Sequence, residues 1–207
     1  MKILITGSNG YIGKAVKEHY SDHNLTLLHR AVCELTDESQ VDNFFTEKYD
    51  VVIHCAALGG NRIERDKPKV LHDTNKFFNI IIYGLFDKNE IDTRFIKSCV
   101  NRCKEGKPII VHKNKQMDFF HMEDLMILID KIVSLDESDE RKWMHHTREF
   151  QAVYWETFDL CQIARIVIDE MGSGEIILGE TGLDKPYTRI GRYYCKGSLL
   201  DRIKQTV

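Results

Sequence analysis

The 207 residues are enough for one compact domain, or for a domain with a smaller lobe. With 43% apolar and 29% charged residues, the composition is that of an ordinary globular chain with a hydrophobic core. A net charge of −3 gives no basic surface for nucleic acid or an anionic membrane, and no apolar stretch approaches the length of a membrane span.

The first thirteen residues predict a strand, a glycine turn and a helix. Residues 2–6 are an apolar, β-branched run; Gly7, Gly10 and Gly13 follow at GxxGxxG spacing, and residues 14–20 have a helical pattern. In such a unit, backbone N–H groups and the positive end of the helix dipole can hold a pyrophosphate. The glycines would supply a turn with φ > 0, close approach to phosphate and close helix–strand packing. We therefore predict a dinucleotide site here, with a purely structural turn as the alternative.

The end of the next predicted strand, residues 25–30, bears on the choice of cofactor. An acidic residue at this place would bind the ribose hydroxyls, whereas an arginine accommodates a 2′-phosphate. The strand ends in His29 and Arg30, and the first carboxylate after it is Glu34. Because guanidinium matches phosphate geometry, we expect NADP(H), with NAD as the alternative. Arg30 could also be no more than a solvated charge.

A helix and a third strand come next. Thr36 or Asp37 can cap a helix that has Val41 and the two phenylalanines at 44 and 45 on its apolar face. Residues 49–57 form a continuous apolar run, which predicts a parallel strand buried on both faces. His54 and Cys55 within it are interpreted as packed core residues. The small residues after this strand would leave room for a ligand, and residues 69–78 predict a further helix.

Two N-terminal motifs resemble the extended short-chain dehydrogenase/reductase family, the NAD(P)-dependent nucleotide-sugar epimerases, dehydratases and reductases. Residues 6–13 are similar to its TGxxGxIG fingerprint, and residues 50–57 to its DxVIHxAA strand. Arg30, residues 34–37 and residues 58–60 look most like GDP-L-fucose synthase-like reductases. Further on, residues 82–86 resemble the YGP-type turn, residues 94–96 the RFI helix start, and residues 116–125 the QxRDFxHVDDL segment with Met117 in place of its arginine.

This resemblance implies an α/β fold: a shortened Rossmann-type doubly wound parallel sheet with a small C-terminal α+β substrate lobe. We expect a dinucleotide-binding half at residues 1–79, and the rest of the sheet plus the lobe at residues 80–207. The implied substrate is a nucleotide sugar, and a homodimer is left open. The implied cofactor-binding residues are Gly7, Asn9, Gly10, Tyr11, Ile12, Gly13, Arg30, Leu35, Ala56, Ala57 and Leu58.

The family's catalytic block has no counterpart in this sequence. The family carries a serine or threonine on one strand and YxxxK on the next helix, where the lysine lowers the pKa of the tyrosine that exchanges a proton with the sugar. None of the eight tyrosines has a lysine four residues on; Tyr83 has Asp87 there and Lys88 one place late. The gap falls near residues 79–80, as an internal deletion or as residues that this sequence omits. Residues 80–86 could pair where the missing strand would lie.

The C-terminal part predicts a mixture of helices and strands. Helices are expected at 95–103, 124–133 and 160–171, the last ended by the glycines from 172 on, and strands at 107–111, 119–122, 151–155 and 176–178. Residues 185–189 weakly resemble a tail segment near the family's substrate. Ile96, Cys99, Val100 and Cys103 would share one helix face.

Neither the cysteines nor the histidines predict a metal centre. The six cysteines show no disulfide framework, and Cys99 with Cys103 lacks a second pair of ligands. His145 and His146 stand without a partner at ligand spacing. Free thiols and an N-terminus that enters a strand without signal-peptide organisation predict a cytoplasmic protein.

Two hypotheses of different classes follow from the sequence. By resemblance, the chain is an NAD(P)-dependent nucleotide-sugar oxidoreductase that passes hydride between nicotinamide and a sugar carbon. Because no catalytic residue can be assigned, the alternative is a catalytically silent dinucleotide-binding protein: a sensor, a partner subunit or a truncated remnant. Turnover of NADPH with a keto nucleotide sugar separates the two.

Overall fold

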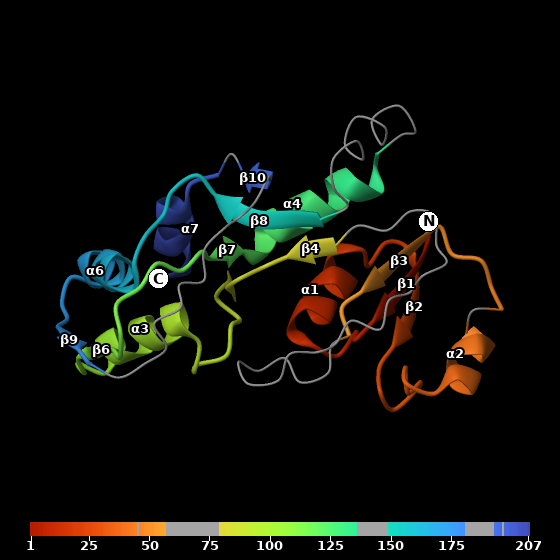
Figure 1. Ribbon diagram of the computed structural model, residues 1–207, viewed down its shortest axis with the longest axis horizontal. Coiled ribbons are helices and arrows are strands. Elements are labelled where there is room, and N and C mark those ends of the chain that lie inside the picture. The colour runs from red at the N-terminus through yellow and green to blue at the C-terminus, as the bar shows by residue number, and fades with distance from the viewer. Residues whose placement is uncertain (45, 57–78, 136–148, 181–192, 196) are drawn as a thin grey trace. The chain divides into compact units, whose positions relative to one another are not determined.

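The computed structural model describes residues 1–44, 46–56, 79–135, 149–180, 193–195 and 197–207 (Figure 1). Within them, helices are interspersed among the strands and all strand ladders are parallel, which confirms the predicted Rossmann-like α/β class. Two compact units are separated, Met1–Asn75 and Lys76–Val207. None of the helices in the described ranges has the length and apolar character needed to cross a membrane.

The first unit contains a three-stranded parallel sheet in the order β2-β1-β3. Its strands are β1 (Lys2–Thr6), β2 (Asn24–Leu28) and β3 (Val51–His54), as Figure 1 shows beside helix α1 (Tyr11–His19). The central strand β1 supplies the core, because Ile3, Leu4 and Ile5 are fully buried. The register places Thr6 beside Leu28 on one side and beside His54 on the other. The carboxyl ends of all three strands therefore lie at one edge.

The two helices in the described part of this unit begin at polar or glycine caps. Helix α1 begins directly after Gly10, three residues earlier than the sequence pattern predicts. Helix α2 (Glu38–Phe44) is preceded by Asp37, whose Oδ1 accepts hydrogen bonds from the backbone N–H groups of Ser39 and Gln40. Of the two predicted caps, Asp37 therefore fills the role.

The prediction that β3 is buried on both faces is wrong. Val51 and Ile53 are half-buried, whereas Val52 is 43% exposed and His54 is also exposed. The physical reason is the position of the strand: among the described residues β3 pairs with β1 alone, so it is an edge strand with one covered face. Half-buried and exposed residues therefore alternate along β3, whereas a central parallel strand would be buried on both faces.

Within the described residues, the second unit contains three small parallel sheets, in the orders β10-β8-β4, β5-β7 and β6-β9. Their strands are β4 (Asn79–Ile81), β5 (Leu85–Phe86), β6 (Ile109–Val111), β7 (Phe120–His121), β8 (Glu149–Tyr154), β9 (Ile176–Leu178) and β10 (Tyr193–Cys195). The helices are α3 (Phe95–Lys104), α4 (Met122–Val133), α6 (Leu160–Met171) and α7 (Leu199–Thr206). Strand β4 pairs with β8, and within the described residues it forms no ladder with β3.

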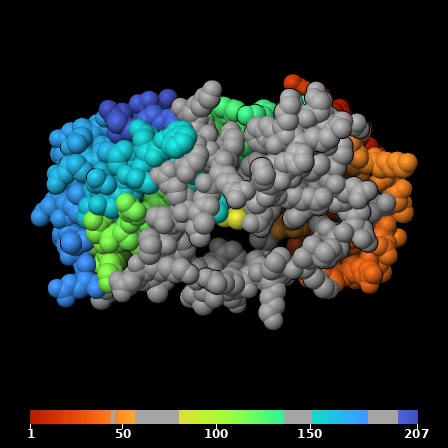
Figure 2. All heavy atoms as spheres, turned by 45° about the horizontal axis from the view of Figure 1, so that its top comes forward, coloured from red at the N-terminus to blue at the C-terminus, as the bar shows by residue number. Residues whose placement is uncertain are grey.

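Amphipathic helices build the core of the second unit. The predicted face of α3 is confirmed, because Ile96, Cys99, Val100 and Cys103 are all buried. Helix α6 has the predicted bounds: a capping box opens it, formed by Asp159 and Gln162, and Gly172 in the left-handed conformation (φ 78°) closes it. Figure 2 shows the last helix, α7 in dark blue, against the cyan atoms of α6 and its neighbours, in agreement with the contacts between α6 and α7.

A buried ion pair connects α4, β8 and α7. Asp124 is 4% exposed and receives two hydrogen bonds from the Arg202 guanidinium, at 2.6 and 2.9 Å, and one from the Tyr154 hydroxyl. The same guanidinium binds Glu123 at 2.6 Å. These carboxylates hold the pKa of Arg202 above its ordinary value. The arrangement fixes the C-terminal helix on the rest of the unit.

Several predictions fall on residues outside the described ranges. They are the helix at 69–78, the pair His145 and His146, the segment 185–189, and the cofactor-binding assignments to Ala57 and Leu58. Two described elements, β10 and α7, were not predicted.

Candidate dinucleotide site

The glycine turn after β1 has the tight geometry that its spacing predicts. Gly7 has φ +64°, and a Cβ built on it would lie 2.6 Å from the backbone nitrogen of Ala56. A Cβ on Gly13 would lie 2.2 Å from the Gly7 carbonyl oxygen. Gly7 therefore brings the end of β1 against the end of β3, and Gly13 brings α1 against the turn. Only glycine fits at either position.

Gly10, by contrast, is less tightly enclosed by the described residues. It is exposed, has an extended conformation (φ −76°), and a Cβ there would meet one atom of the described residues within 4 Å, the Gly7 carbonyl oxygen at 3.2 Å. As the N-cap residue of α1 it makes no side-chain cap bond, and no acidic residue occupies the first turn. No carboxylate of the first turn therefore repels an anion at the positive end of the helix dipole. The residues present fit a pyrophosphate.

Thr6 and His54 join the ends of β1 and β3 beside this turn. The Thr6 hydroxyl is 2.7 Å from Nδ1 of His54, and it accepts a hydrogen bond from the backbone N–H of Ala56 at 3.3 Å. Thr6 is 2% exposed. The interpretation of His54 as a packed core residue is wrong, since the residue is exposed. Desolvation there lowers the pKa of His54 below its ordinary value.

A second contact holds the turn to β2. The backbone N–H and the hydroxyl of Ser8 both donate to the carbonyl oxygen of Leu28, each at 3.1 Å. Ser8 is buried, with 2% of its surface exposed. The sequence analysis did not predict three residues of this site: Thr6, Ser8 and His54. The motifs contain them, but a motif does not show the strand register that brings them together. Their positions at the ends of predicted strands could have indicated them.

Arg30 lies where the ribose of a dinucleotide is expected, two residues after β2. Its side chain is 73% exposed, and its Nε is 3.5 Å from the Glu34 carboxylate one helical turn on. An exposed pair of this length contributes little to stability, so the guanidinium can exchange its partner at small cost. Leu35 instead packs against the small core of Leu4, Leu28 and Cys33, where it is half-buried.

The remaining predicted residues lie together at the start of α1. Asn9 is exposed, and Tyr11 and Ile12 are half-buried in the first turn of the helix. With Gly7, Gly10 and Gly13 they form one continuous segment beside Ala56, itself half-buried. The structure therefore brings these seven assignments together, whereas Leu35 belongs to the core.

Tyr83 and Tyr154 are engaged in structural contacts. The Tyr83 hydroxyl donates to Gln151 at 3.0 Å, and burial followed by the charge of Asp118 raises the pKa of Tyr83. The Tyr154 hydroxyl donates to Asp124 inside the core. A phenol that exchanges protons near neutral pH needs the opposite pKa shift, which a neighbouring cation supplies. Neither tyrosine has the environment of a proton donor to a sugar.

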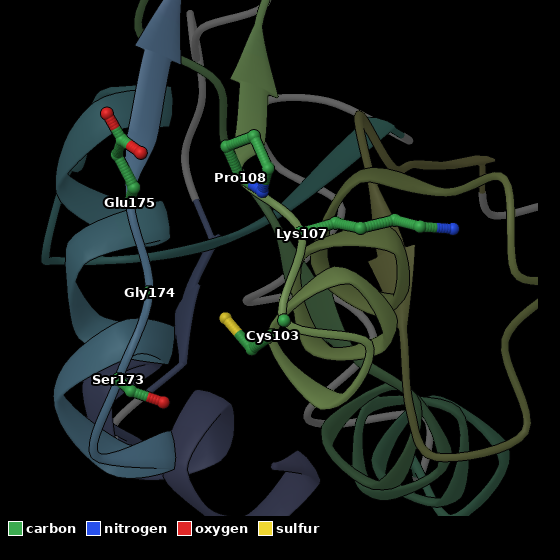
Figure 3. A pocket seen from close by; sticks show the side chains of 7 residues that line it. Cys103, Lys107, Pro108, Ser173, Gly174 and Glu175 are labelled. Carbon is green, nitrogen blue, oxygen red and sulfur yellow. The ribbon is translucent and has the colours of Figure 1, made fainter.

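The second unit has a small cleft between the end of α3 and the loop after α6. Its volume is about 220 Å³, and its lining includes Cys103, Lys107, Ser173, Gly174 and Glu175. In Figure 3, the charged ends of Lys107 and Glu175 point in different directions rather than towards a common point. Ligand sites usually measure about 300–1,000 Å³ and contain convergent polar groups, so this cleft is a poor candidate.

Comparison with known families matches residues 3–82 to the NAD dependent epimerase/dehydratase family. This segment contains both N-terminal motifs and the whole glycine turn. The match confirms the resemblance predicted from them. A search of curated proteins finds no match.

Solved structures show the same fold at low sequence identity. The GDP-mannoheptose C4 reductase MlghC from Campylobacter jejuni, solved with NADP bound, has a TM-score of 0.72 at 15% identity, with 99% of this chain and 96% of that chain covered. A GDP-L-fucose synthetase from Naegleria fowleri bound to NADP has a TM-score of 0.64 at 15% identity, with 99% and 91% covered. A dTDP-glucose 4,6-dehydratase from Bacillus anthracis in complex with NAD has a TM-score of 0.72 at 12% identity, with 100% and 95% covered.

Proposed function

We propose that this chain, with its N-terminal match to the NAD dependent epimerase/dehydratase family, is an NAD(P)-dependent oxidoreductase-like protein that acts on a nucleotide sugar. The observation that carries the proposal is the glycine turn at the start of α1, where a Cβ on Gly10 would meet, among the described residues, only the Gly7 carbonyl oxygen at 3.2 Å. Gly7 and Gly13 are close-packed on either side of it, which a merely structural turn would not require.

The cofactor would be held by the turn and by the ends of β1, β2 and β3. The N–H groups of Tyr11 and Ile12, at the start of α1, would bind the pyrophosphate. Arg30 would leave Glu34 for the 2′-phosphate of NADP, a dianionic partner that a guanidinium binds in two-pronged fashion. NADP(H) is the favoured cofactor and NAD the alternative, in line with the ligands named for the similar structures. When bound, the nicotinamide supplies hydride transfer.

The nucleotide-sugar substrate is proposed from the family match and from the named activities of the similar structures. The cytoplasm is the proposed location, because disulfides are rare in reducing compartments and five of the cysteines are free thiols: Cys33, Cys55, Cys99, Cys103 and Cys161.

Binding and turnover are the direct tests. Purified protein should quench or enhance NADPH fluorescence in a saturable titration, and NADH should bind more weakly. Oxidation of NADPH in the presence of a 4-keto nucleotide sugar, such as GDP-4-keto-6-deoxymannose, would support the enzyme. Absence of binding by either cofactor would overturn the proposal as a whole.

A second candidate function, a dinucleotide-binding protein without catalysis, is favoured by one specific observation. No tyrosine of the sequence has a lysine four residues on, and both Tyr83 and Tyr154 are committed to structural hydrogen bonds. Saturable NADPH binding without turnover of any keto nucleotide sugar would support this function instead. An intact mass above 24.2 kDa for the natural protein would show that the polypeptide carries residues beyond this sequence. The catalytic residues would then be sought among those additional residues.

A further inference from the structure

We propose that Thr6 and His54 are positioning residues for the cofactor: a directed chain of hydrogen bonds, from Ala56 through Thr6 to His54, holds the end of β3 against Gly7. This inference rests on the proposed function, because the contact it maintains forms one wall of the dinucleotide site. Neither residue touches the cofactor in this account. They act through Ala56 and Gly7.

The contact they maintain is unusually close. A Cβ on Gly7 would lie 2.6 Å from the Ala56 nitrogen and 2.8 Å from the Cys55 carbonyl carbon, so the two backbones lie against each other without an intervening side chain. The Cys55 N–H donates to the Thr6 carbonyl oxygen at 3.1 Å and is the last ladder bond between the strands. Beyond it, the Thr6 hydroxyl continues the ladder by accepting from the Ala56 N–H at 3.3 Å. A side chain thus extends the pairing by one residue.

The direction of the chain follows from the donors and acceptors available. The Thr6 hydroxyl is buried and already accepts from Ala56, so its own proton needs an acceptor. Nδ1 of His54, at 2.7 Å, is the acceptor that the structure offers. His54 must then be neutral, with its proton on Nε2. Protonated Nδ1 would instead present a second donor to the Thr6 oxygen.

The charged groups of these strands lie at their other ends. Lys2 begins β1 and pairs with Glu47, and its backbone N–H donates to Asp50, which precedes β3. At the carboxyl edge, the lowered pKa of His54 arises from desolvation. The neutral, Nε2-protonated form is therefore compatible with its surroundings at pH 7.

Nitrogen NMR of ligand-free, ¹⁵N-labelled protein tests the direction of the chain. The two neutral tautomers of histidine give different patterns of ring-nitrogen shifts, and His54→Asn identifies the resonance. We expect the Nε2–H form with a hydrogen-bonded Nδ1. A proton on Nδ1, or equal populations of the two tautomers, would overturn the proposal.

Cofactor affinity tests the positioning role. Thr6→Val removes the hydroxyl at constant shape, and His54→Leu removes the acceptor; each should raise the Kd for NADPH about tenfold, by freeing the Ala56 segment. Thr6→Ser keeps the hydroxyl and His54→Asn offers Oδ1 in place of Nδ1, so each should stay within about threefold of the parent protein. The double variant Thr6→Val with His54→Leu should lose no more than either single variant, because both break the same chain.

The outcomes separate this inference from the proposed function. If the parent protein binds neither NADPH nor NADH, the proposed function fails, and the tautomer measurement still decides whether the hydrogen-bond chain exists. If the parent binds NADPH and His54→Leu binds it equally well, the positioning role fails while the function stands. Should Thr6→Val not fold, the exposed position of His54 leaves the comparison of His54→Leu with His54→Asn decisive.

Discussion

A side chain at Gly10 would contact fewer described atoms than one at Gly7 or Gly13. A substitution at Gly10 should therefore affect cofactor binding without affecting stability. The Gly10 backbone is in a conformation that any residue can adopt, with one described neighbour at 3.2 Å. Gly10→Val is therefore expected to fold with a melting temperature close to that of the parent. NADPH binding should be lost, because the side chain would occupy the approach of the pyrophosphate. Fluorescence titration and thermal unfolding of the same sample measure both effects.

Gly7→Ala and Gly13→Ala provide the contrasting variants. Each added methyl group would lie within 2.6 Å of backbone atoms, and Gly7 also has φ +64°. Both variants should lower the free energy of unfolding by about 2 kcal/mol or more. If either one kept the parent's stability and lost only NADPH affinity, the distinct structural roles assigned to the three glycines would be wrong.

At Arg30 the prediction concerns discrimination between cofactors. Arg30→Ala should raise the Kd for NADPH about tenfold or more and the Kd for NADH by less than about twofold, because only NADPH carries the 2′-phosphate. Glu34→Gln is the matched variant. It removes the carboxylate that lies 3.5 Å from Arg30 Nε, and it should lower the Kd for NADPH slightly. Equal losses for the two cofactors after Arg30→Ala would remove the assignment of NADP.

At the scale of secondary-structure elements, the turn that leads into α3 contains a buried carboxyl group, that of Glu90. Glu90 is 6% exposed, and its Oε2 has no hydrogen-bond partner. Desolvation raises the pKa of Glu90 to about 8, against the opposing influence of Arg94 and Lys97 and with a further rise from Asp87. The folded chain therefore holds a proton that the unfolded chain releases at a much lower pH.

This difference fixes the sign of a pH effect on stability. Between about pH 4.5 and pH 8 the folded state binds the extra proton, so the free energy of unfolding falls as the pH rises. Glu90→Gln should abolish this fall, and at pH 9 it should be more stable than the parent by roughly 3 kcal/mol. Urea unfolding at pH 5 and pH 9 measures it. Glu105→Gln removes an exposed carboxylate at the opposite end of α3 and should leave the pH profile between pH 5 and pH 9 unchanged. A profile equally steep in Glu90→Gln would contradict the assignment.

A half-buried cation of helix α7, Arg202, joins this helix to α4. Arg202→Ala would leave Asp124, at 4% exposure, with the Tyr154 hydroxyl but without its counter-ion. We expect a loss of about 3 kcal/mol in urea unfolding. Lys204→Ala, in the same helix but in an exposed pair with Glu170, is the control and should change little. Similar losses in the two variants would mean that the helix is held by packing alone.

At the scale of the whole chain, the two units should respond differently to the cofactor. All predicted cofactor residues within the described ranges belong to Met1–Asn75. NADPH at one hundred times its Kd should stabilise that unit by about 2.7 kcal/mol. Hydrogen exchange should accordingly slow in β1, α1 and β3, with little change in α3 and α6. Equal slowing in both units would show that they unfold together.

The sequence anticipates elements whose signals are local. Helix α6 could be bounded in advance, because its apolar spacing, the cap at Asp159 and the glycine after Met171 all lie within its own stretch. The exposed face of β3 could not be predicted, because the burial of a strand depends on whether another strand lies beside it. The hydrogen bond between Thr6 and His54 needs the register of two strands, and the pair of Asp124 and Arg202 joins residues far apart in the chain.

The parallel pairing of the described strands has a consequence for how the chain folds. Parallel neighbours cannot be joined by a tight hairpin, and here Asn79 pairs with Glu149, Phe86 with His121 and Ile109 with Ile176. Each ladder must therefore close a long loop before its hydrogen bonds form, which places the protein among slow folders, on a scale of milliseconds to seconds or longer. During that interval the edge of β3, with Val52 exposed, is open to other chains. Refolding yield should thus fall as protein concentration rises.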